Sequence, residues 1–106
     1  MFKIQKTQET QNGMKKITSI NASFNQLVEI LGETNVKNGD DKTSNEWNLM
    51  FIDTDLDEEN ICCIYDFKQG CYENDEIIEW NIGSCDFCAA VELKVVLSEK
   101  LNNSLV

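Results

Sequence analysis

Few side chains in this sequence can do chemistry, and their types favour binding over catalysis. The chain has five cysteines, 19 acidic residues, nine lysines, and neither histidine nor arginine. The lack of histidine excludes serine–histidine triads, cysteine–histidine dyads and most catalytic zinc sites. Candidate nucleophiles are present, but no paired base is recognisable beside them. We therefore expect a protein that is not an enzyme and that has no cofactor.

Two short motifs imitate metal sites, and each is incomplete. Cys85-Asp86-Phe87-Cys88 has the spacing of one zinc knuckle, but the chain has no second pair with that spacing. The segment 53–57 imitates the start of a calcium loop, yet the loop lacks its glycine at the sixth position and its glutamate at the twelfth. We predict no metal site. Because no signal peptide is recognisable, we interpret the cysteines as reduced packing residues.

The net charge of −10 restricts the partners of the chain. Direct binding to DNA or RNA phosphates needs a basic surface, so neither nucleic acid is expected as a partner. The acidic residues within 53–59 and 73–79 form a rim, which either keeps the protein soluble or imitates nucleic-acid phosphates to occupy a basic host protein. The chain can bind an anionic small molecule only at a place where lysines and backbone N–H groups cluster.

A set of aromatic, lysine and hydroxyl side chains is the best candidate for contact with such a ligand. Indole and phenol rings can stack on a nucleobase, although the competing interpretation is that these rings form the core. The loop before the first aromatic strand brings a lysine and two hydroxyls together, and another lysine follows the second strand. The candidate ligand-binding residues are Trp47, Tyr65 and Trp80 for the base, with Lys42, Thr43, Ser44, Lys68 and Asn81 beside them.

Periodicity places these residues on one α+β domain that spans residues 1–106. Apolar residues at helical spacing, with Asn21 as cap and Gly32 at the end, predict a helix over 21–32. Residues 85–101 fit a helix or a strand, and a helix is preferred because the segment exceeds a usual strand and Asp86 can cap it. Between the helices, alternation indicates an antiparallel sheet of three or slightly more strands, at 46–52, 61–67 and 77–83. The expected fold is this sheet with an N-terminal and a C-terminal helix packed on it.

Two further expectations concern the N-terminus and the faces of the sheet. Residues 1–20 contain Asn12-Gly13, a strong hairpin-turn signal, so they form either an exposed hairpin or an arm that orders on a partner subunit. One helix layer covers only one face of a sheet. A second apolar face, which suggests a homo-oligomer, is assigned to Met50, Ile52, Cys62 and Ile64.

Four short motifs follow one another between residues 24 and 101. They are Leu31-Gly32, Lys42-Thr43-Ser44-x-Glu46-Trp47, Ile64-Tyr65-Asp66-Phe67-Lys68 and Glu79-Trp80-Asn81-Ile82-Gly83. Their order resembles a widespread family of short proteins from phages and large DNA viruses, which we take to include the anti-CBASS sponges. The sequence departs from that family in having Asn81 where histidine is common and no further glycine near Ser84.

The resemblance implies a viral immune-evasion protein that sequesters a cyclic dinucleotide or oligonucleotide signal of bacterial defence without cleaving it. It also implies a dimer or tetramer that holds the ligand between subunits in the cytoplasm of the host cell. No run of about 18 apolar residues is present, so no membrane partner is expected. The alternative function is an acidic protein–protein inhibitor that imitates nucleic acid and docks on a host nuclease or another basic defence protein.

Overall fold

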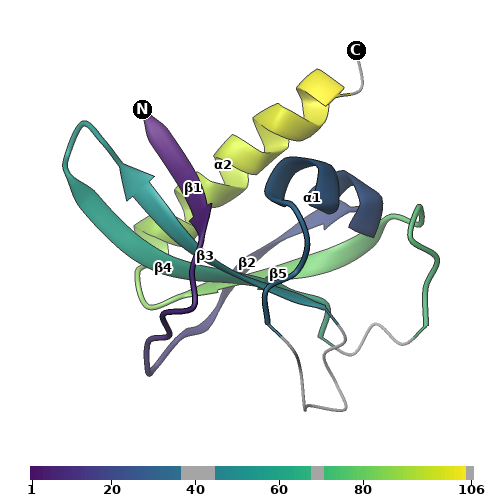
Figure 1. Ribbon diagram of the computed structural model, residues 1–106, viewed down its shortest axis with the longest axis horizontal. Helices are drawn as coiled ribbons and strands as arrows, with labels where there is room; N and C mark the ends of the chain where they lie inside the picture. Colours follow the sequence, from purple (N-terminus) through teal and green to yellow (C-terminus); the bar gives the residue numbers. More distant parts are fainter. Residues whose placement is uncertain (37–44, 68–70, 105–106) are drawn as a thin grey trace.

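An antiparallel sheet with two helices packed on one of its faces makes up the protein (Figure 1). The computed structural model describes residues 1–36, 45–67 and 71–104. The strands lie in the order β1-β3-β4-β5-β2, and each neighbouring pair is antiparallel. The elements are β1 (Phe2–Lys6), β2 (Lys15–Ala22), α1 (Phe24–Leu31), β3 (Glu46–Asp53), β4 (Glu58–Tyr65), β5 (Ile78–Ser84) and α2 (Phe87–Ser104).

The predicted α+β class and antiparallel sheet are confirmed, but the sheet has five strands and is larger than expected. The additional strands are β1 and β2, which occupy opposite edges. Of the two forms expected for residues 1–20, the exposed hairpin is therefore wrong, although Asn12 and Gly13 do form a turn in which Gly13 has a φ of 85°. An Asn-Gly turn reverses the chain locally, but the pairing of each strand depends on partners far along the chain, here β3 and β5.

Helix α1 begins at a capping box. The Ser23 hydroxyl accepts a hydrogen bond from the Gln26 backbone N–H (3.1 Å), and the Gln26 side chain accepts one from the Ser23 N–H (2.8 Å). Asn21, the predicted cap, belongs to β2 instead. Gly32 ends the helix with a φ of 82°, a left-handed value that favours glycine, and its N–H donates to the Val28 carbonyl (2.7 Å). The predicted helix is thus confirmed, with its cap moved from Asn21 to Ser23.

Helix α2 confirms the helical interpretation of residues 85–101. The Asp86 carboxylate accepts a hydrogen bond from the Ala89 N–H (2.9 Å), as expected of the predicted cap. Small residues near the start of the helix allow close approach to the sheet, and leucines fill the space further along. The buried residues of α2 are Ala89, Ala90, Leu93, Leu97 and Leu101.

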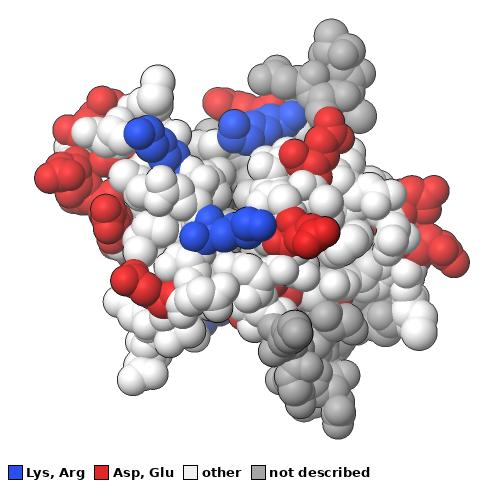
Figure 2. Space-filling view, in the orientation of Figure 1, with Lys and Arg blue, Asp and Glu red and all other residues white. Residues whose placement is uncertain are grey.

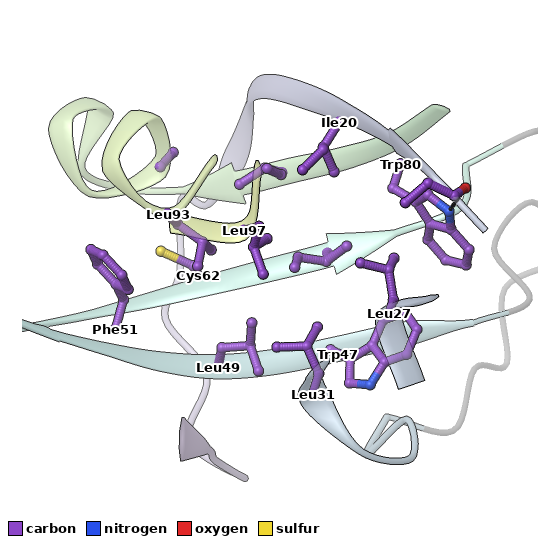
Figure 3. Packing of buried hydrophobic residues seen from close by; sticks show 14 of the residues in the cluster. Ile20, Leu27, Leu31, Trp47, Leu49, Phe51, Cys62, Trp80, Leu93 and Leu97 are labelled. Atoms are coloured by element: carbon purple, nitrogen blue, oxygen red, sulfur yellow. Dashed lines mark hydrogen bonds between the residues drawn. The ribbon is translucent and has the colours of Figure 1, made fainter. Parts of the chain in front are cut away.

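The core lies between the helices and the inner face of the sheet, which carries both tryptophans (Figure 3). The register pairs Trp47 with Ile64 and Leu49 with Cys62, so Cys62 and Ile64 belong to this inner face. The sequence pattern predicted them on the opposite face, which is wrong. Alternation within β4 is visible in the sequence, but the face that turns inward depends on the register with β3.

The outer face of the sheet, opposite the helices, carries apolar and polar side chains together. Its partly buried members include Met50, Ile52, Ile61, Cys63 and Tyr65. The connection from β1 to β2 passes over part of this face, because residues 9–11 line a groove of about 320 Å³ with Met50 and Ile61. The chain itself therefore occupies part of the outer face, and the predicted self-association stays a prediction.

Candidate functional site

The two tryptophans predicted to stack on a base lie in the core (Figure 3). Both have an exposed fraction of 0%. The Trp47 indole N–H donates to the Gly32 carbonyl (2.9 Å), and the Trp80 indole N–H donates to the Ala22 carbonyl (3.0 Å). The two rings meet edge to face with 5.4 Å between their centroids, and Phe24 packs against both. With no exposed surface and a bonded polar edge, neither indole can receive a ligand in this structure.

Two of the predicted ligand-binding residues, Tyr65 and Asn81, are cross-strand partners on the outer face. Tyr65 also lies opposite Glu46 of β3, and Asn81 lies opposite Ser19 of β2. Directly paired residues project from the same face of a sheet, so these side chains form one polar line across four strands. We call it the outer-face row, and its members are Glu46, Tyr65, Asn81 and Ser19. The other predicted residues lie outside the described part of the chain: Lys42, Thr43, Ser44 and Lys68.

Some polar side chains of the outer-face row have no hydrogen-bond partner among the described residues. Asn81 is 6% exposed, yet its carboxamide makes no hydrogen bond with any group in residues 1–36, 45–67 or 71–104. Burial, and then the nearby Asp66 charge, raises the pKa of the Glu46 carboxyl. Burial also raises the pKa of the Tyr65 phenol, with further contributions from Cys63 and Glu46. A buried polar group without a partner costs about 1–3 kcal/mol, so this row does not stabilise the fold by itself.

A buried carboxylate at the end of β4 organises a separate polar network. Asp66 is 2% exposed and accepts hydrogen bonds from the Asn45 backbone N–H (2.9 Å) and from the Tyr72 hydroxyl. The Asn45 side-chain amide donates to the Tyr72 hydroxyl oxygen (2.8 Å). Burial, followed by the bond to Asp66, raises the pKa of the Tyr72 phenol. A phenol that resists ionisation serves as a donor, so the network ties the start of β3 to the end of β4 and is structural.

A groove that the sequence did not reveal lies between β1, α1 and α2. Figure 2 shows lysine side chains gathered over β1 and α2 on this face, with acidic side chains around them. The Lys6 ammonium lies over the end of α1, where it donates to the Glu33 carbonyl (3.3 Å). The groove has a volume of about 310 Å³ and is lined by Phe2, Lys3, Ile4, Gln5, Ile30 and Lys100. We call these residues, together with Lys6, the lysine groove.

Strand β1 contributes backbone groups to the lysine groove because it is an edge strand. The Thr7 N–H donates to the Asn48 carbonyl (3.1 Å), and the Thr54 N–H donates to the Met1 carbonyl (2.9 Å). The backbone N–H and C=O groups of the odd-numbered residues in this segment therefore bond to β3. Those of the even-numbered residues point the opposite way. The residues whose backbone N–H and C=O groups point away from the sheet are Phe2, Ile4 and Lys6.

The cysteines are free thiols, and two of them are shielded by the fold. Burial raises the pKa of Cys62 to about 11 and, together with the charge of Glu46, raises that of Cys63 to about 12. Such thiols stay protonated at neutral pH and neither attack nor bind metal readily. Among the described residues, no group of three or more cysteine, aspartate or glutamate side chains is placed to hold a metal ion.

No helix in the described segments combines the length and apolar character needed to cross a membrane. No family model, curated protein or solved structure matches the chain. The resemblance to phage proteins therefore remains an inference from the motifs alone.

Proposed function

We propose that the protein binds a cyclic dinucleotide or oligonucleotide in the lysine groove and holds it without cleavage. The observation that carries this proposal is that Lys3 and Lys100 line one groove, with Lys6 nearby at the end of α1, in a chain whose net charge is −10. Ammonium groups attract phosphates, and the outward N–H groups of β1 supply directed hydrogen bonds to phosphate oxygens. The location differs from the predicted site, whose indoles belong to the core.

The groove also offers a surface for a base. The Phe2 ring is 38% exposed and stacks on Phe51, with 5.1 Å between the centroids and 14° between the planes. Base stacking on an aromatic ring contributes about 1–3 kcal/mol per base. The outward carbonyls of β1 can accept hydrogen bonds from amino groups of the base. A single ligand with phosphates, base edges and base faces would thus use every kind of group in the groove.

The chemistry of the groove supports binding without turnover. Cleavage of a phosphodiester needs an activated nucleophile, a general base or a metal ion held by acidic side chains. The described residues that line the groove carry only apolar groups, a carboxamide and ammonium groups. A protein that retains a signalling nucleotide intact lowers its free concentration, which is how immune evasion by sequestration would operate.

Calorimetric titration of the full chain with cyclic di- and trinucleotides tests the proposal. The double variant Lys3→Gln with Lys100→Gln removes two ammonium groups from the groove. Lys94→Gln is the matched control, because Lys94 is also on α2 but lines a different groove, next to β2. An exposed ionic contact contributes up to about 1 kcal/mol, so the loss of two such contacts should weaken binding by up to roughly thirtyfold. The control should bind as the wild type does.

Three results would contradict this function. Saturable binding to no member of the panel would refute nucleotide binding. A loss of affinity in the Lys94→Gln control equal to that in Lys3→Gln or Lys100→Gln alone, each of which also removes one charge, would show general charge attraction instead of a site. Native mass spectrometry that detects cleaved nucleotide would refute sequestration; the same spectra would report the subunit number with and without ligand.

A second function, inhibition of a basic host protein, is favoured by the turn between β3 and β4. Asp53 Oδ1 accepts hydrogen bonds from the backbone N–H groups of Asp55 (3.0 Å) and Leu56 (3.2 Å), which fix the turn. Leu56 is 66% exposed among acidic neighbours. An apolar side chain held among acids matches a basic surface with an apolar pocket. Asp57→Lys with Glu58→Lys should abolish salt-dependent inhibition of a basic nuclease and leave nucleotide affinity unchanged.

A further inference from the structure

The outer-face row is separate from the lysine groove and has hydrogen-bonding capacity that the described part of the chain does not use. It crosses β3, β4, β5 and β2 on the side of the sheet away from the helices. Asn81 is buried without a side-chain hydrogen bond in the part of the chain that the structure describes, and the partly buried Glu46 and Tyr65 lack one there as well. Folded proteins leave few buried polar groups unpaired. A partner that supplies hydrogen bonds would account for this row.

The charges on this face determine the kind of partner. Glu46 is acidic, and the charge of the buried Asp66, which belongs to the neighbouring network, also acts on it. Lys16 is on the same face, but it pairs with Glu79 (Nζ–Oε1 3.8 Å). A phosphate would meet repulsion here, and an apolar partner would leave the row without hydrogen bonds. A cation with several hydrogen-bond donors satisfies both the charge and the acceptors.

We propose that the outer-face row binds an arginine side chain of a basic partner protein. A guanidinium has five N–H donors and no acceptor, and its planar fork fits a carboxylate with two parallel bonds. Glu46 receives the fork, the Tyr65 ring covers one face of the guanidinium, and the Asn81 carboxamide oxygen accepts a further N–H. The chain has no arginine of its own, so the guanidinium comes from another molecule.

The geometry favours arginine over lysine. Neighbouring strands lie about 4.8 Å apart, so Glu46 on β3 and Asn81 on β5 are separated by about twice that distance, with Tyr65 between them. A planar guanidinium that donates from both of its sides covers such a span better than a single ammonium nitrogen does. A lysine ammonium is a compact point charge that is strongly hydrated and cannot form the paired bonds to a carboxylate. This site should therefore bind an arginine side chain more tightly than a lysine side chain of the same charge.

Titration of the isotope-labelled full chain with two blocked peptides, followed by NMR, tests the proposal. The peptides are acetyl-Gly-Arg-Gly-amide and its lysine counterpart. The arginine peptide should shift the Asn81 side-chain NH₂ signals in a saturable manner and bind about tenfold more tightly than the lysine peptide. Glu46→Gln should reduce arginine binding to the lysine level. Glu79→Gln, which makes the same charge change on the same face, should leave the preference intact.

Either of two results would overturn the arginine site. Equal affinity for the two peptides would show attraction by net charge alone. If Glu79→Gln lowers the affinity for the arginine peptide as much as Glu46→Gln does, the peptide binds elsewhere on the acidic surface. If Glu46→Gln does not fold, the wild-type titration decides, because both the arginine preference and the Asn81 shift are required. Nucleotide titrations do not involve this row, so the two sites fail or succeed independently.

Discussion

Replacement of Trp80 by phenylalanine separates a core role of this indole from a role in ligand contact. Trp80 has no exposed surface, and its N–H is the donor to the Ala22 carbonyl. Phenylalanine keeps an aromatic ring beside Trp47 and Phe24, but it removes the donor and part of the side-chain volume. The variant therefore perturbs packing and one hydrogen bond while it leaves the apolar character of the site unchanged.

The size of the effect follows from these two losses. A buried carbonyl deprived of its donor costs about 1–3 kcal/mol. The missing volume adds a packing loss, and truncation of tryptophan to alanine, at about 3–5 kcal/mol, sets the upper bound. We expect the free energy of unfolding to fall by about 2–4 kcal/mol. In a domain of this size each kcal/mol lowers the melting temperature by roughly 4–8 °C.

Urea unfolding followed by far-ultraviolet circular dichroism measures this change, because the backbone signal does not depend on the tryptophan that is removed. The free energy of unfolding should fall with urea concentration at the same slope as in the wild type. An unchanged slope shows that unfolding exposes the same surface. Leu56→Ala at the exposed turn is the control and should shift stability by at most about 0.5 kcal/mol. A loss below about 1 kcal/mol in Trp80→Phe, combined with weaker nucleotide binding, would refute the core assignment.

Three further predictions concern the helix cap, the Glu46 carboxyl and the thiols. Ser23→Ala removes the acceptor of the capping box and should lower the free energy of unfolding by about 1 kcal/mol in urea titrations, while Ser23→Asp should retain most of it. Because the folded state raises the pKa of Glu46, it favours the neutral carboxyl, and the resulting destabilisation is absent below the unfolded value near 4.5 and grows as the pH rises through the folded pKa. Glu46→Gln should therefore raise the melting temperature at pH 7 and leave it unchanged at pH 4; equal shifts at both pH values would contradict this reasoning. At pH 8 the thiols of Cys62 and Cys63, with pKa values of about 11 and 12, should react with the thiol reagent DTNB only after denaturation, unlike the exposed Cys71, Cys85 and Cys88.

Local signals in the sequence located most of the helices and central strands. Strand β3 begins at Glu46 as predicted, and both helices lie where apolar periodicity and capping residues indicated them. These signals depend on residues close together in the chain, so the sequence contains them directly. The edge positions of β1 and β2 depend instead on distant partners, and nothing in Asn12-Gly13 specifies a partner strand.

The candidate sites were harder to predict than the helices, because they too depend on residues that are distant in the sequence. Tyr65 and Asn81 are distant in the sequence, and only the register of β4 with β5 makes them neighbours. Trp80 was recognisable as an aromatic strand residue, but its inward direction follows from the packing of the helices. The lysine groove joins Lys3 and Lys100 from opposite ends of the chain, a proximity that spacing along the sequence cannot express.

The placement of β1 and β2 at opposite edges has a consequence for synthesis of the protein. Residues 1–22 leave the ribosome well before their partners, because Phe2 pairs with Asp53 and Lys15 pairs with Ser84. The sheet must therefore grow outward from β3, β4 and β5, and such non-local pairing is slow. Until the earliest-made strands dock, the nascent chain presents two open strand edges to its neighbours, which makes translation the stage at which it is most exposed to aggregation.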